Sequence, residues 1–214
     1  MSHARIVAIG GGSSSGKSSI ADSLAAACNK AAGIAFATVQ KLDSFYIGLR
    51  DGETPETRNW DDPASLNWGQ IRSTIASLKS GISCDVPIYD YALHKPSDVV
   101  RHVKSTPLVI IEGIHALHAN IRDECDELIF IDCDPTIMLG RRIARDEVQR
   151  GRSKESIIKQ YFEQVEPAYN AHILPTREHV KPSFCIENSG NDGVEKLIND
   201  SCCHIVDCCV ALTL

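Results

Sequence analysis

The segment that most constrains the fold lies near the N-terminus, where residues 5–19 read RIVAIGGGSSSGKSS. Residues 11–18 satisfy the pattern G-x-x-x-x-G-K-S, in which glycines let backbone N–H groups turn inward around phosphate oxygens. Such a loop requires a strand before it and a helix after it whose N-terminus faces the same anion. The sequence supplies both, because RIVAI precedes the loop and the alanine-rich segment 18–32 follows it.

The loop predicts a site for a nucleoside triphosphate, ATP or GTP, together with Mg²⁺. We expect Lys17 to reach the β- and γ-phosphates and the Ser18 hydroxyl to bind the metal ion. The residues expected to contact the nucleotide here are Gly11, Gly12, Ser13, Ser14, Ser15, Gly16, Lys17, Ser18 and Ser19. The alternative is a flexible Gly/Ser turn, which has no need of the flanking strand and helix.

Apolar runs rich in β-branched residues alternate with helical patterns along the rest of the chain. The runs are continuous, as in strands that are buried on both faces of a parallel sheet. The expected strands are 5–9, 34–39, 107–113, 127–132 and 183–187. The expected helices are 18–32, 63–81, 136–151, 153–173 with an interruption at Pro167, and 192–212. This order predicts an α/β P-loop NTPase fold with a doubly wound, mostly parallel five-stranded sheet.

Two segments add to this plan. Residues 83–94, SCDVPIYDYALH, break the alternation and predict an inserted β-hairpin, whereas residues 136–155 predict an arginine-rich helical lid. We expect a single domain over residues 1–214, a length that suffices to bury a substantial core.

Composition limits the partners of the chain. The net charge is −6, so the surface as a whole does not attract nucleic acid, and we expect no such partner. No apolar run approaches the roughly 18 residues of a transmembrane helix, so we expect no membrane partner. The N-terminus lacks the apolar core of a signal peptide, and we expect a cytoplasmic location.

The chain contains nine cysteines, and the last four form two doublets in CCHIVDCC. The sequence has no C-x-x-C pair, so the usual spacing of zinc or redox sites is missing. We therefore expect reduced thiols that pack as small apolar side chains. A metal site in CCHIVDCC is the alternative.

Two acidic residues occupy positions where phosphoryl transfer needs them. Asp43 follows the second expected strand, where a carboxylate can accept a hydroxyl proton as the γ-phosphoryl group departs. Glu112 ends the buried strand LVIIE and can hold Mg²⁺ directly or through water. The alternatives are a helix-capping or turn aspartate and a surface glutamate.

Five arginines lie within twelve residues of this acidic chain: Arg141, Arg142, Arg145, Arg150 and Arg152. Guanidinium groups on a closing lid stabilise the charge of phosphoryl transfer and exclude water. The alternative is a solvated basic face paired with Asp146 and Glu147, in which one or two of the arginines have a structural role.

The same loop serves switch GTPases, motor ATPases and small-molecule kinases. A guanine-reading N-K-x-D motif is absent, and the chain has no second subdomain large enough for a motor. Asp43, Glu112 and the arginines therefore favour a kinase.

The chain resembles the uridine kinase (uridine–cytidine kinase) family of P-loop kinases, which is related to phosphoribulokinase. The resemblance rests on elements in the family's order: GGSSSGKSS, LDSFY, NWDDPASLNW, PIYDYALH, VIIEGIHAL, RRIARDEVQRGR and QYFEQVEPAYNAHILPT. The loop alone is unspecific, but LDSFY, NWDDP and PIYDYALH together are specific to this family.

The resemblance implies roles for the matched residues. Asp43 would be the base that faces the 5′-hydroxyl of a nucleoside, and Asp61 would bind the ribose 2′- and 3′-hydroxyls. Tyr89 and His94 would read the polar edge of a pyrimidine. The aromatic walls of the pocket would be Tyr46, Trp60 and Tyr91. Further contacts with the substrate would come from Arg142, Arg152 and Gln160.

Two arginines and one aspartate are implied at the nucleotide. Arg145 would act on the phosphates in catalysis, Arg150 would bind the nucleotide from the lid, and Asp192 is a weaker candidate for a contact with adenine. The chain also departs from the family. Met138 stands where an arginine usually precedes the Arg-Arg pair, and the segment after LPT differs, which bears on specificity more than on the reaction.

These observations predict ATP- and Mg²⁺-dependent phosphorylation of the 5′-hydroxyl of uridine, and also of cytidine, in pyrimidine salvage. One alternative is a kinase for another small hydroxyl substrate, such as a ribosyl-pyridine or a sugar phosphate. The other is a regulatory protein that binds nucleotide without transferring phosphate. The family resemblance also implies a homo-oligomer, a tetramer.

Overall fold

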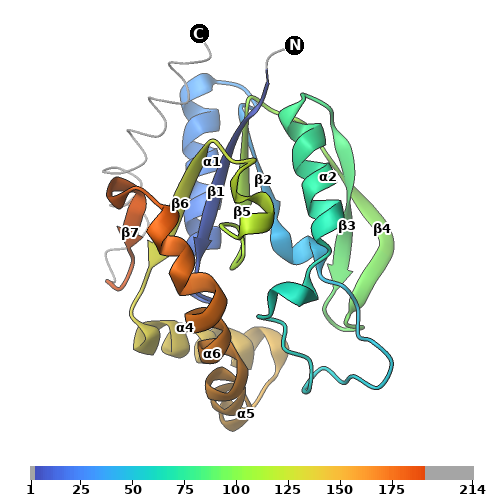
Figure 1. The fold of residues 1–214 in the computed structure, drawn as a ribbon, viewed down its shortest axis with the longest axis vertical. Coiled ribbons are helices and arrows are strands. Elements are labelled where there is room, and N and C mark those ends of the chain that lie inside the picture. Colours follow the sequence, from blue (N-terminus) through green and yellow to red (C-terminus); the bar gives the residue numbers. More distant parts are fainter. Residues whose placement is uncertain (1–2, 191–214) are drawn as a thin grey trace.

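A parallel β-sheet forms the centre of the molecule in the computed structural model, which describes residues 3–190 (Figure 1). Its strand order is β2-β5-β1-β6-β7, and every neighbouring pair is parallel. The strands are β1 (Arg5–Gly11), β2 (Ala37–Lys41), β5 (Leu108–Glu112), β6 (Glu127–Asp132) and β7 (Cys185–Glu187). The predicted α/β fold with a five-stranded parallel sheet is confirmed.

The strand register brings three segments that are distant in sequence together at the carboxyl ends of the central strands. β5 lies between β1 and β2, and its last residue, Glu112, is paired with Ile9 on one side and Lys41 on the other. The P-loop begins just after Ile9, and Asp43 follows Lys41 by two residues. Ligands of open α/β sheets bind beyond the carboxyl ends of the strands, so a site is expected there, next to Glu112.

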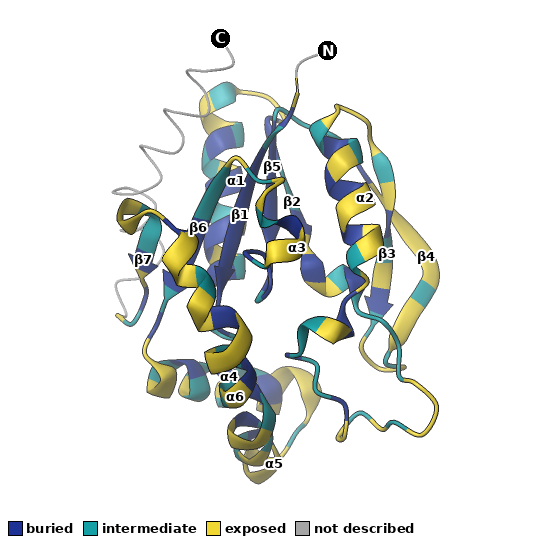
Figure 2. Ribbon diagram, viewed as in Figure 1, coloured by how far each residue is buried: buried dark blue, intermediate teal, exposed yellow. Residues whose placement is uncertain are grey.

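Both faces of the sheet are covered, and this explains why its strands are apolar throughout. The side chains of a strand alternate between faces. Val7 and Ile9 of β1 pack with α1, whereas Ile6 and Ala8 belong to a second core that includes α2. The sheet is accordingly buried along most of its length (Figure 2).

The helices follow the predicted order with shifted ends. The α-helices are α1 (Lys17–Ala32), α2 (Trp68–Lys79), α3 (Ala119–Arg122), α4 (Pro135–Arg150), α5 (Lys154–Gln160) and α6 (Glu166–Ala168). Shorter 3-10 turns cover Leu42–Phe45, Pro63–Ser65, Leu174–His179 and Pro182–Phe184. Within residues 3–190, no helix has both the length and the apolar character needed to cross a membrane. The predicted terminal helix at 192–212 and the CCHIVDCC segment lie outside the described residues.

The predicted interruption at Pro167 is wrong. The chain stays helical from α5 through Tyr161–Val165, α6 and Tyr169–Ile173, and the two named segments on either side of α6 are π-helical. A π turn uses i→i+5 hydrogen bonds, so these wider turns accommodate a residue that has no N–H donor.

Boundaries of the strands also differ from the sequence prediction. β7 begins at Cys185 rather than at residue 183, because Pro182–Phe184 form a 3-10 turn. The antiparallel hairpin consists of β3 (Cys84–Asp90) and β4 (Lys95–Val103), so residues 83–94 cover only its first strand and its turn. β2 begins at Ala37 rather than at residue 34 because the side chain of Asn29 accepts hydrogen bonds from the backbone N–H groups of Phe36 and Ala37, both at 2.7 Å.

Candidate active site

The P-loop has the backbone conformation that its glycines predict. Gly11 and Gly16 have φ angles of 141° and 95°, and Ser14 joins them with a φ of 65°. α1 begins directly afterwards at Lys17, so its N-terminus faces the loop. The Lys17 ammonium donates a hydrogen bond to the carbonyl oxygen of Gly12 at 3.1 Å, which folds the side chain back over the loop.

The charges around Lys17 belong to the residues that the sequence singles out. Burial lowers the pKa of Lys17, while the carboxylates of Glu112 and Asp43 raise it again. The pKa of Glu112 is in turn raised by burial, and Lys17 opposes that shift. Lys17 therefore lies between two acidic groups and would gain a further partner from any bound phosphate.

Ser18 and Glu112 fit a magnesium ion. The Ser18 hydroxyl donates a hydrogen bond to a Glu112 carboxylate oxygen at 3.0 Å, so two hard oxygen donors stand side by side at the carboxyl end of β5. Mg²⁺ prefers such oxygen ligands and takes its remaining ones from water and substrate phosphates. These two residues are the ones expected to hold the metal ion.

A cavity of about 980 Å³ opens next to the P-loop. It is lined by Ser13, Lys17 and Ser18 of the loop and by every residue that the family resemblance assigns to the nucleoside. Ser19 is exposed on the outer side of α1, and Asp192 lies outside the described residues. The cavity has the size of a small-molecule site.

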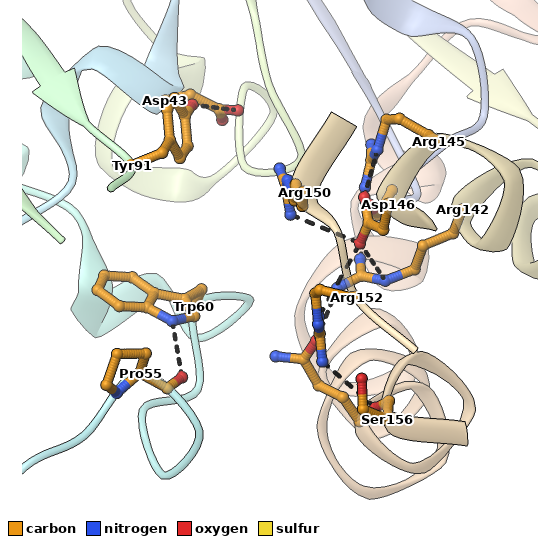
Figure 3. A network of polar contacts seen from close by, with 12 residues as sticks. Asp43, Pro55, Trp60, Tyr91, Arg142, Arg145, Asp146, Arg150, Arg152 and Ser156 are labelled. Carbon is orange, nitrogen blue, oxygen red and sulfur yellow. Dashed lines mark hydrogen bonds and ion pairs between the residues drawn. The ribbon is translucent and has the colours of Figure 1, made fainter. Parts of the chain in front are cut away.

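Asp43 lines this cavity and is exposed, on the 3-10 turn that follows β2. Its carboxylate accepts a hydrogen bond from the Tyr91 hydroxyl at 3.3 Å (Figure 3). The Arg150 guanidinium lies over the ring of Tyr91, 5.8 Å from its centroid. The hairpin and the arginine-rich helix therefore meet above Asp43.

Five aromatic rings form one wall of the cavity. Tyr46 is 5.8 Å from Trp60 and 5.5 Å from Tyr89, in edge-to-face arrangements. Tyr89 continues to Tyr91 at 5.2 Å, and the ring of His94 stacks on Trp60 at 5.6 Å. The Trp60 indole N–H donates a hydrogen bond to the carbonyl oxygen of Pro55 at 3.2 Å, which fixes the plane of the indole (Figure 3).

Asp61 faces the same cavity from the loop between β2 and α2. Burial raises the pKa of its carboxyl group, while the nearby cations Arg142 and Lys17 lower it. Its backbone carbonyl accepts a hydrogen bond from the ring of His115 at 2.9 Å. The loop is thus held in place from the end of β5.

The arginines divide into two groups. Arg142, Arg145, Arg150 and Arg152 line the cavity. Arg141 instead donates a hydrogen bond to the carbonyl oxygen of Asn188 at 3.0 Å, on the other side of α4, so this arginine has a structural role. Gln160, at the end of α5, accepts hydrogen bonds from the guanidinium groups of Arg142 at 3.2 Å and Arg152.

Sequence reasoning assigned no role to two buried polar residues that support the site. His115 holds the Asp61 loop, and Asn188 donates a hydrogen bond from its side-chain amide to the carbonyl oxygen of Ser15 at 2.7 Å. Asn188 also fills the space next to Gly16, where no side chain fits. Neither residue has a sequence signal, because each acts across a long sequence separation.

Asp146 is a further buried residue that supports the site. The sequence pairs it with arginines on a solvated face, but it is fully buried among the cavity arginines. The i,i+4 spacing to Arg142 and Arg150 was a signal for contact, and only its burial was unpredictable.

Comparison with known proteins agrees with this geometry. A model of the family described as "Phosphoribulokinase / Uridine kinase family" matches residues 6–184. A protein of Macrococcus caseolyticus named "Uridine kinase" is 33% identical over 198 residues, which are 91% of this chain and 93% of that protein. "Uridine/cytidine kinase UKL1, chloroplastic" of Arabidopsis thaliana is 34% identical over 178 residues, 81% of this chain.

The Arabidopsis relative is much longer, and the chain spans only 36% of its length. Among solved structures, phosphoribulokinase from Rhodobacter spheroides superposes with a TM-score of 0.63, covering 84% of this chain and 69% of that one. At 16% sequence identity, this likeness shows the fold alone.

Proposed function

The chain belongs to the phosphoribulokinase / uridine kinase family, and we propose that it is a nucleoside kinase that transfers the γ-phosphoryl group of ATP to the 5′-hydroxyl of uridine and cytidine. One observation carries this proposal. A single cavity joins the P-loop residues Lys17 and Ser18 to the carboxylates of Asp43 and Asp61 and to the aromatic wall. A protein that only bound nucleotide would have no need of the second half of this cavity.

Catalysis in this proposal is mostly positioning and stabilisation of charge, because the transition state of phosphoryl transfer is loose. Lys17 and Arg145 stabilise the charge on the transferred group, and Arg150 binds the phosphates from the lid. Ser18 and Glu112 would hold Mg²⁺, which would supply neutralisation of charge on the phosphate oxygens. Asp43 accepts the proton of the attacking 5′-hydroxyl.

The acceptor half of the cavity suits a ribonucleoside. A single carboxylate such as that of Asp61 can accept hydrogen bonds from both hydroxyls of a cis-diol. The Tyr89 hydroxyl is buried and has no hydrogen-bond partner within residues 3–190, so it is available for a polar edge of the base. His94 has a positive φ of 49°, a costly conformation for a non-glycine residue, and it directs the ring onto Trp60.

The test is ADP release from ATP and Mg²⁺, without an acceptor and then with uridine, cytidine, thymidine, adenosine or nicotinamide riboside. Stimulation by uridine and cytidine alone is the expected result. Stimulation by nicotinamide riboside alone would make the protein a kinase for a ribosyl-pyridine. Bound ATP without stimulation by any acceptor would favour a regulatory nucleotide-binding protein.

The proposal also covers the pathway, the cellular location and the oligomeric state. Uridine and cytidine phosphorylation would serve pyrimidine salvage in the cytoplasm, by a homo-oligomer such as a tetramer. Size-exclusion chromatography with light scattering measures the oligomeric state. A monomer at micromolar concentration would refute the proposed homo-oligomer.

A further inference from the structure

The cavity arginines converge on one carboxylate. Asp146 of α4 has no exposed surface, and each of its four ion-pair partners contributes to the wall of the cavity. The N···O distances from Asp146 are 2.7 Å to Arg145, 3.6 Å to Arg150, 3.7 Å to Arg142 and 4.0 Å to Arg152. Figure 3 shows these four side chains around it.

The backbone of Asp146 fixes the same group. α4 ends at Arg150, and the capping residue Gly151 has a φ of 61°, a left-handed conformation that turns the chain out of the helix. The N–H groups of Gly151 and Arg152 both donate hydrogen bonds to the carbonyl oxygen of Asp146, that of Arg152 at 3.3 Å. Arg152 has left the helix, yet this turn returns it to the arginines of α4.

The carboxylate of Asp146 acts mainly through its charge. Burial raises the pKa of Asp146. The hydrogen bond from Arg145 and the charges of Arg145, Arg150 and Arg142 outweigh burial, so the pKa is lowered overall. Only one of its oxygens, Oδ1, accepts a hydrogen bond, whereas Oδ2 has none within residues 3–190. One negative charge therefore faces four positive charges, and the excess is positive.

The excess positive charge of the cavity arginines lies next to the P-loop. Arg142 donates a hydrogen bond to the Ser13 hydroxyl at 3.0 Å, and Arg145 is close enough to lower the pKa of Lys17. Four guanidinium groups this close repel one another, and without a counter-charge they would separate toward solvent. Phosphoryl transfer needs them in one arrangement around the transferred group.

We propose that Asp146 is a positioning residue that holds the four cavity arginines in the arrangement that phosphoryl transfer needs, at the cost of neutralising one of their charges. This inference rests on the proposed function for its effect on turnover, but its effect on anion binding does not depend on the acceptor. Asp146 is buried and does not line the cavity, so it acts through the arginines.

The experiment compares Asp146→Asn with Glu147→Gln. Glu147 is the next residue of α4 and is exposed, so the two variants change the net charge equally. Two quantities are measured on each full-length variant: kcat and KM in the ADP-release assay, and the Kd of inorganic tripolyphosphate by calorimetry. Asp146→Glu, which keeps the charge, is included in case Asp146→Asn fails to fold.

We expect opposite changes in the two quantities. In Asp146→Asn, kcat falls at least tenfold because the arginines lose the arrangement that the transferred group needs. Tripolyphosphate is a flexible anion that can follow the displaced arginines, and it binds about threefold more tightly than to Glu147→Gln because one more positive charge is free. Asp146→Glu recovers most of kcat. A residue that only stabilised the fold would weaken turnover and binding together.

Several results would overturn the inference. These are an unchanged kcat in Asp146→Asn, a parallel loss of tripolyphosphate binding, or, where Asp146→Asn does not fold, a kcat of Asp146→Glu equal to that of Glu147→Gln. If wild-type protein shows no turnover with any acceptor, the proposed function fails instead. Asp146 is then judged on tripolyphosphate alone, and equal Kd values in Asp146→Asn and Glu147→Gln refute its role.

Discussion

His115 makes the stability of the protein depend on pH in a way that the structure specifies. The ring is 1% exposed, and its Nε2 lies 2.9 Å from the carbonyl oxygen of Asp61, so Nε2 carries the proton and donates. Nδ1 is buried without a hydrogen-bond partner among the described residues. Protonation of Nδ1 would therefore place an unpaired N–H and a positive charge in the core.

The pKa of His115 is lowered from 6.5 to about 4. Burial is the largest cause, the hydrogen bond to Asp61 opposes it, and the neighbouring His118 and His172 lower the value further. A shift of this size corresponds to about 3 kcal/mol in the free energy of unfolding at 1.36 kcal/mol per pKa unit. The unfolded chain binds the proton first, so this stability is present above pH 6.5 and is lost as the pH falls toward 4.

The assay is urea unfolding at pH 7.5, 6.5, 5.5 and 4.5 for the wild type, His115→Gln and His102→Gln. Glutamine can donate the same hydrogen bond to Asp61 but does not titrate, whereas His102 is an exposed histidine on β4 and serves as the control. Between pH 7.5 and 4.5 the wild type should lose about 2.5 kcal/mol more than His115→Gln. Parallel curves for these two proteins would refute the reasoning, because other groups that titrate are common to both.

Three further changes test the site. Asp43→Asn should leave ATP affinity within about threefold of wild type but reduce kcat by on the order of 10² or more, measured by ADP release, since it removes the base; near-normal turnover would remove Asp43 from that role. His94→Ala should raise the KM for uridine about tenfold and that for ATP less than twofold, because the ring stacks on Trp60; equal losses would make the hairpin turn a structural element. Gly16→Ala should abolish ATP binding in calorimetry, because a side chain there meets Asn188 at a φ of 95°, and wild-type affinity would contradict the loop geometry.

The sequence predicted the sheet well because its signals are local. Continuous apolar runs mark strands buried on both faces, and the order of elements sets a parallel sheet. The P-loop, Asp43 and Glu112 were predictable for the same reason, since each directly follows or ends a strand whose carboxyl end faces the site. The strand register then brings them together without any further information.

The sequence predictions were wrong where tertiary structure overrides a rule that depends on local sequence. Pro167 predicts the end of a helix, but the chain stays helical through the π-helical turns on both sides of this residue. The sequence prediction ended the hairpin at residue 94, whereas its second strand extends to Val103. This strand was missed because it has no apolar pattern of its own and is mostly exposed.

The burial of Asp146 is the clearest case of information that local spacing lacks. An arginine and an aspartate at i,i+4 have the same sequence pattern on a solvated face, where such pairs contribute little. The difference comes from the packing of α4 on the P-loop, where Met138 fills the space beside Gly12 and Arg142 bonds Ser13. Met138, which departs from the family's arginine, is 3% exposed and can therefore bring the helix close enough to bury the carboxylate. An apolar residue at 138 and an ionised one at 146 thus act together to keep the cavity arginines close to the P-loop.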